Sequence, residues 1–140
     1  MTFVPENFFE AIYTKFTGCT ALKNAVAGLY PNEVPQGTAY PYIVYYMIDD
    51  IPARWFSHTS EVIRVQFSIF HQTSTGNPLS TIMDVANKLM ACFDDATVAV
   101  TNYTSVYVTR DMGRLVREEG ASEQERVWHY SIDYMIRISE

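Results

Sequence analysis

The chain has 140 residues, a length that suits a single domain with a core that needs no metal or disulfide. Hydrophobic residues make up 48% of the sequence, which excludes an intrinsically disordered protein. The formal net charge is −6, so the chain lacks the excess of basic residues that a dedicated nucleic-acid-binding protein needs.

The N-terminal residues carry neither a basic segment nor a long apolar run, and no stretch approaches the roughly 20 apolar residues that span a bilayer. We therefore expect a protein of the cytoplasm that has no contact with a membrane. Cys19 and Cys92 lie far apart in the sequence and belong to no metal-binding spacing. We expect both to be buried free thiols in a reducing compartment.

The first part of the chain is expected to be helical. Apolar residues at helical spacing predict a helix over residues 5–17, with Pro5 at its first turn and Gly18 at its end. A short helical turn is expected over residues 21–27. The connector that follows, residues 29–36, contains two prolines and can hold no more than a short edge strand.

Two strands should come next. Residues 40–50 combine aromatic and β-branched side chains on both faces, which predicts a strand that is covered on both sides or central. Residues 51–60 are expected to form a loop or wide turn. Apolar residues then alternate with polar ones over residues 63–69, the pattern of a strand that is wet on one face.

The second half of the chain contains the clearest helix signal. From Pro78 to Phe93 apolar residues keep helical spacing, and Asp84 and Lys88 form an i,i+4 pair on the other side. Strands are expected over residues 98–108, 110–118 (with a bulge at Gly113) and 127–138. The whole pattern predicts one α+β domain over residues 1–140. We expect a mostly antiparallel sheet of about four to five strands, with the N-terminal helix and the long amphipathic helix on one face.

No pattern in the sequence indicates catalysis, a cofactor or a metal ion. The histidines have no second ligand at zinc spacing, and nucleophile motifs and glycine-rich phosphate loops are missing. Three carboxylate pairs, Asp49–Asp50, Asp94–Asp95 and Glu118–Glu119, sit at expected strand or helix ends, where solvated acids are ordinary. An alternative remains: a small enzyme or ligand-binding domain in which these acids and His71 and His129 converge in a cleft.

Two segments resist a purely structural explanation. Arg54, Trp55 and Phe56 lie in an expected loop, and such residues are typical anchors of protein interfaces. Residues 109–126 are dense in both charges and should form a protruding hairpin, in which Arg114, Arg117, Glu118 and Glu119 could contact a neighbouring copy. A further alternative, an adaptor that binds a peptide along a sheet edge, requires an exposed and uncapped edge strand.

Four stretches occur in a familiar order: QGTAYPYIVYYMIDD, VQFSIF, ACFDD and WHYSIDYMI. With Pro35-Gln36-Gly37 and Pro41-Tyr42 as its sharpest motifs, the chain resembles over nearly its whole length the tail terminator and tail-to-head joining proteins of long-tailed phages. The resemblance implies a small α+β subunit with no catalytic residues and no cofactor. Such subunits assemble as a ring, commonly a hexamer, that ends the tail tube and docks to the head connector while DNA passes through its centre.

The expected partners are therefore further copies of the chain, the tail-tube protein and the head connector protein. The expected location is the head-proximal end of the virion tail, after synthesis in the cytoplasm of the bacterial host. The acidic balance fits this role, because a negative or neutral channel does not retain DNA.

Overall fold

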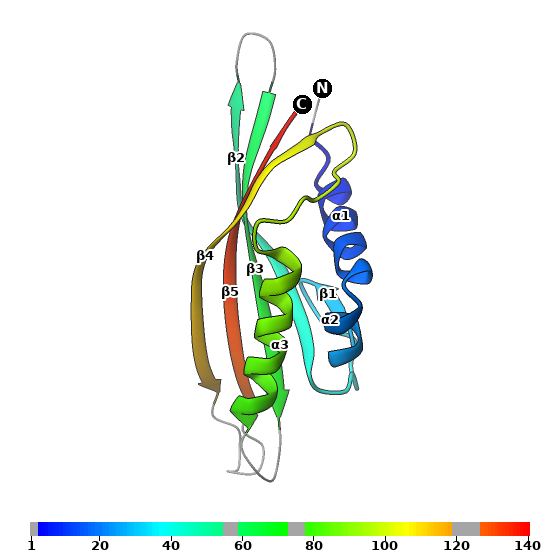
Figure 1. Cartoon of the computed structure of the whole chain (residues 1–140), viewed down its shortest axis with the longest axis vertical. Helices are drawn as coiled ribbons and strands as arrows, with labels where there is room; N and C mark the ends of the chain where they lie inside the picture. Colours follow the sequence, from blue (N-terminus) through cyan, green and yellow to red (C-terminus); the bar gives the residue numbers. More distant parts are fainter. Residues whose placement is uncertain (1–2, 55–58, 73–77, 119–126) are drawn as a thin grey trace.

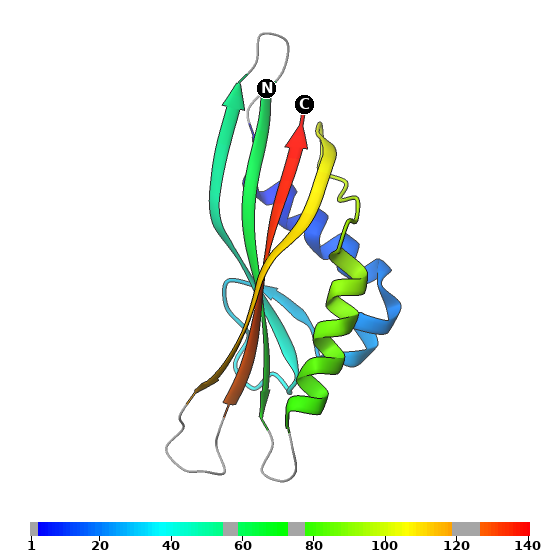
Figure 2. The same cartoon turned by 60° about the vertical axis from the view of Figure 1, so that its left-hand side comes forward.

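A computed structural model describes residues 3–54, 59–72, 78–118 and 127–140. The strands form a five-stranded sheet in the order β1-β2-β3-β5-β4, in which β1 runs parallel to β2 and the other neighbours are antiparallel. Both α1 and α3 lie over the same face of this sheet (Figures 1 and 2), so the predicted α+β class and the one-sided helix packing are confirmed. The elements are α1 (Pro5–Gly18), α2 (Thr20–Ala25), β1 (Leu29–Pro31), β2 (Tyr42–Arg54), β3 (Thr59–Gln72), α3 (Pro78–Phe93), β4 (Thr104–Glu118) and β5 (Val127–Ser139).

Both long helices begin and end close to the predicted residues. In α1, proline occupies the first turn, Glu6 lies near the positive N-terminal end of the helix dipole, and Lys15 lies near the negative end. Its apolar stripe, which includes Phe8, Ile12 and Phe16, is buried against the sheet. The apolar stripe of α3 is buried in the same way, and the predicted Lys88–Asp84 pair forms at 2.8 Å on its outer side.

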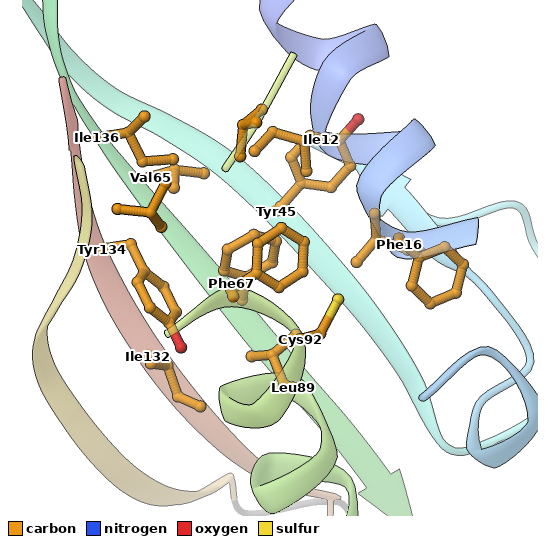
Figure 3. Packing of buried hydrophobic residues seen from close by; sticks show 14 of the residues in the cluster. Ile12, Phe16, Tyr45, Val65, Phe67, Leu89, Cys92, Ile132, Tyr134 and Ile136 are labelled. Carbon is orange, nitrogen blue, oxygen red and sulfur yellow. The ribbon is translucent and has the colours of Figure 1, made fainter. Parts of the chain in front are cut away.

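The core lies between these helices and the sheet, with Phe67 of β3 at its centre (Figure 3). The Phe67 ring lies 4.7 Å from Phe93, 5.8 Å from Tyr134 and 6.1 Å from Tyr45, measured between ring centroids. Tyr134 is fully buried, and its hydroxyl donates a hydrogen bond of 2.5 Å to Asp94 at the end of α3. The predicted inward face of β5 is confirmed for its last four members, since Ile132, Tyr134, Ile136 and Ile138 are all buried.

The first hairpin is longer than predicted. Residues 51–54, which we expected in a loop, continue β2 and pair with β3, from Ile51 opposite Val62 to Arg54 opposite Thr59. Pro52, which has no N–H to donate, is tolerated here because β1 pairs with β2 only as far as Tyr45. At Pro52 no described strand lies on that side of β2 to accept a backbone hydrogen bond.

The two strands expected over residues 98–108 and 110–118 are one strand, β4, which starts only at Thr104. Val98 and Val100 are buried and alternate as strand residues do, but they precede the ladder. Register shifts between Ser105 and Tyr107 and between Arg110 and Met112 bend the strand without ending it.

Gly113 has a different role from the predicted bulge. A Cβ atom at this position would collide with the phenol end of Tyr130 on the neighbouring strand.

The prediction of free thiols is wrong, because Cys19 and Cys92 form a disulfide with a Cα–Cα distance of 5.9 Å. Cys19 lies between α1 and α2, and Cys92 lies in the last turn of α3. The packing of the helices side by side brings together two residues that are 73 positions apart, a proximity that spacing in the sequence does not reveal.

The Pro35-Gln36-Gly37 motif forms a β-turn. The Thr38 N–H donates to the Pro35 carbonyl at 3.2 Å, and Gly37 has a φ of 85° at the third position. This is the arrangement of a type II turn, which favours glycine because other residues rarely adopt a positive φ. The turn therefore explains why glycine completes the motif before β2.

Candidate functional site

The structure places the predicted interface residues at opposite ends of the molecule. Arg54 ends β2 at one end of the sheet, whereas Arg117 and Glu118 end β4 at the other (Figure 1). Arg114 is exposed on β4. Trp55, Phe56 and Glu119 lie outside the described residues. The described members of the two segments therefore do not share one surface.

The groups that a catalytic site would need are also dispersed. His71 pairs with Trp128, whereas His129 pairs with Phe70, so that the two histidines lie on neighbouring strands and point to opposite faces. Asp94 follows α3 and accepts a hydrogen bond from Tyr134 of β5, whereas Asp49 and Asp50 lie in β2, which is not a neighbour of β5 in the sheet. In the described part of the chain no group of three or more His, Cys, Asp or Glu residues could hold a metal ion.

Among the described residues, the carboxyl group with a strongly perturbed pKa belongs to Glu61 on β3, which is 8% exposed. Burial, followed by a hydrogen bond with Asp50 and the charge of Asp50, raises the pKa of Glu61 to about 7, while the positive charge of Arg54 opposes the shift. Arg54 thus acts on an acid pair of its own chain.

The sheet face without helices carries a row of rings that crosses three strands. Tyr40 stacks on Tyr42 at 5.1 Å, Tyr42 on Phe70 at 5.4 Å, and Phe70 lies 5.0 Å from His129. Beside this row, the small side chains of Ser68 and Ser131 are buried. The remainder of the face mixes polar groups, such as the ion pair of Arg64 with Asp111, with exposed apolar side chains such as Ile48 and Met112. Antiparallel sheets commonly have one face in contact with water.

An apolar groove of about 770 Å³ opens beside β1, at one edge of the sheet. Tyr13 of α1 lies in it with 50% of its surface exposed, and the charged side chains of Glu10 and Lys23 also line it. The other lining residues are Phe9, Thr14, Phe16, Ala27, Gly28, Leu29, Tyr30, Pro31 and Tyr45.

The other edge of the sheet is formed by β4, a strand of 15 residues whose side chains are mostly exposed. It carries four of the large hydrophobic side chains that are exposed in the described structure, namely Val106, Tyr107, Met112 and Leu115. Long exposed edge strands with apolar side chains pair or pack readily with other chains. The edge is not uncapped, as the adaptor alternative required, because the Asp95 N–H donates to the Val108 carbonyl at 3.0 Å.

Comparison with known families decides among these possibilities. The model of the family described as tail completion protein gp17 matches residues 10–139. The chain belongs to this family.

The membership confirms the resemblance and the expectation that the protein is not an enzyme. As a tail completion protein, it is a structural component of a phage-like tail. The fold is also similar to a chain of a solved structure titled "Virion of native gene transfer agent (GTA) particle". That similarity has a TM-score of 0.77 at 14% identity and covers 94% of this chain and 93% of the other. No curated protein sequence matches the chain significantly.

Among the described residues, no helix of this tail completion protein is long and apolar enough to cross a membrane. Sequence reasoning did not find the groove or the β4 edge. Both depend on which strands end the sheet, and the strand order places β1, a three-residue strand, at one edge. The apolar residues of β4 are visible in the sequence, but they look like core residues unless it is known that β4 is an edge strand.

Proposed function

We propose that this tail completion protein is the subunit of a ring, of six copies in the commonest arrangement, that ends the tail tube and docks to the head connector. The observation that carries the proposal is the similarity over the whole fold. The family model matches residues 10–139, and a chain with the same fold, at 94% coverage, belongs to a virion.

The shape of the subunit supports a ring. A cyclic assembly of identical copies needs two different surfaces on each subunit, because each copy contacts one neighbour on either side. The chain offers two such surfaces, the apolar groove at β1 and the exposed strand β4, at opposite edges of the sheet.

The charge of the subunit supports passage of DNA. A ring of these chains has a strongly negative total charge, because each copy carries a formal charge of −6. A channel with a negative or neutral wall does not attract the phosphate backbone, so that DNA moves through the ring without being retained.

Deletion of the gene from the phage or particle that encodes it tests the proposal, with electron microscopy as the measurement. Tails of uncontrolled length would assign the protein to termination of the tail tube. Tails of normal length that are detached from filled heads would assign it to head–tail joining. Normal infectious particles would overturn both roles, and a plasmid copy of the wild-type gene provides the control.

A second experiment addresses the partners. Native mass spectrometry of the purified chain, alone and with the tail-tube protein, should show ring-sized oligomers or a complex with the tube protein. A strict monomer at high concentration that also fails to bind the tube protein would argue against the ring.

A further inference from the structure

We infer that the apolar groove at β1 receives the β4 edge of the next copy, so that the subunits of the ring contact each other head to tail across these two surfaces. This inference rests on the proposed ring and names the surfaces that close it. The occupant of the groove is a second copy of the chain.

The first argument is that the two surfaces lie at the same level of the sheet. Partner residues can be followed strand by strand from one edge to the other. One row runs through Gly113, Ile132, Phe67, Tyr45 and Pro31, and a second through Leu115, Tyr130, Ile69, Ile43 and Leu29. Both rows begin in β4, beside its exposed apolar residues, and end in the lining of the groove.

This alignment matters because rotation about one axis relates the copies of a closed ring, with no shift along that axis. When the axis runs roughly along the strands, rotation brings opposite edges together at equal height. Leu115 of one copy, which points to the helix-covered side of the sheet like its partner residue Tyr130, then meets the groove around Tyr13 of the next. A surface at another height would produce a helical filament in place of a ring.

The second argument is chemical complementarity. Leu115 is 38% exposed, and because it pairs with Tyr130 it points to the helix-covered side of the sheet, the side on which α1 and the groove lie. This apolar side chain has a size that fits an apolar groove.

The third argument is that β1 itself cannot accept a long partner strand. It has three residues and ends in Pro31, which has no N–H to donate. Proline on a short edge strand blocks continuous pairing of sheets. Side-chain insertion into the groove is therefore the mode of contact that this edge permits.

The test introduces a charge on each surface and compares it with a matched control. Leu115→Glu and Tyr13→Glu should each reduce the ring fraction at least tenfold in native mass spectrometry, and in particles they should reduce the copies of the protein per tail. Val106→Glu is the control for β4, because Val106 is exposed as well, at 53%, but lies at a level that β1 does not reach. Ile48→Glu, at 49% exposure on the helix-free face, is the control for the groove.

Mixing the two variants gives a sharper result. Leu115→Glu retains an intact groove and Tyr13→Glu retains an intact edge, so that one interface can still form between them. A one-to-one heterodimer, with no ring, is the expected product. Full rings from either variant, or rings lost equally in the control variants, would overturn the inference.

If the subunits form a ring only on the tail, cross-linking in purified particles tests the same contact. In the double variant Leu115→Cys, Tyr13→Cys, the new thiols are the only free ones, since Cys19 and Cys92 are paired. A short bis-maleimide should then give a ladder of covalent oligomers, and either single variant should stay monomeric.

An amine-reactive cross-linker separates failure of this inference from failure of the proposed function. Oligomers with the amine reagent but none with the bis-maleimide would overturn the interface and leave the ring in place. Monomers with both reagents would count against the ring itself.

Discussion

The two faces of the sheet are made by alternate residues of the same strands, yet they have different neighbours. On one face Phe67 is fully buried beneath the helices and contacts rings from three other elements. On the other face Phe70, three residues along the same strand, remains partly exposed in a row of rings that no described helix covers (Figure 2).

This difference indicates how a small assembly protein divides its surface. The helix-covered face supplies the apolar burial that stabilises the fold, because α1 and α3 remove it from water. The uncovered face, the groove and the β4 edge contribute less to stability, and so they are free to carry contacts with other subunits. The predictions below test whether stability is concentrated on the covered face.

The largest effect is expected from truncation of the central ring. Phe67→Ala should lower the free energy of unfolding by about 3–5 kcal/mol, because it leaves a cavity among Phe93, Tyr134 and Tyr45. Phe70→Ala should cost about 1 kcal/mol, since water can fill the space on the open face. Urea denaturation of both variants measures the difference. Equal losses would contradict the division between the two faces.

The disulfide tests the covered side in another way, because it ties the α1–α2 junction to α3. Replacement of Cys19 and Cys92 by serine should lower the free energy of unfolding by about 2–4 kcal/mol. The reason is that the unfolded chain gains conformational entropy when no cross-link closes its long loop. The wild type in a strong reductant should show the same loss by differential scanning calorimetry. A melting temperature that neither change affects would show that packing alone fixes the helices.

Sequence periodicity predicted most of the covered face, because burial on one side imposes a pattern on each element. The stripe of α3 and the alternation in β5 are read directly from the residues. The limits of the strands were harder to predict. Val98 and Val100 alternate like strand residues and are buried, although they precede the ladder. Residues 51–54 contain a proline, which is typical of a loop, although β3 pairs with them.

The candidate surfaces could not be predicted in the same way. The level at which Leu115 faces Leu29 across five strands follows from the registers of four pairings, and local sequence fixes none of them. The proximity of Cys19 and Cys92 is equally non-local. Arg54 and Arg114 were identified as unusual, but the sequence did not reveal that they lie toward opposite ends of the sheet.

A smaller effect, dependent on pH, is expected at the acid pair on the covered side. The pKa of Glu61 is about 7 in the folded protein, above its ordinary value of 4.5, so that between these values the folded state binds more protons than the unfolded state. The stability that protonated Glu61 contributes is therefore present below pH 4.5 and lost as the pH rises to about 7.

Glu61→Gln mimics the protonated acid and should remove this loss, which solvent screening limits to about 1 kcal/mol. The melting temperature of the variant should exceed that of the wild type at pH 8 and approach it at pH 4.5. Parallel profiles for the two proteins between these values would show that Glu61 does not titrate as described.

The smallest effect is expected from an ion pair on the uncovered face, compared with a polar contact on the covered one. Arg64 pairs with Asp111 at 2.5 Å, but 28% and 43% of these side chains are exposed, so Arg64→Ala should cause only a small loss of stability, which becomes smaller in high salt. Tyr134→Phe removes the part-buried hydrogen bond to Asp94 and should cost about 1 kcal/mol, with little dependence on salt. Urea denaturation at 50 mM and 1 M sodium chloride measures both (roughly 14 Å and 3 Å screening lengths). A salt-dependent loss in Tyr134→Phe, or a salt-independent loss in Arg64→Ala, would mean that the two faces differ less in their access to water than their packing indicates.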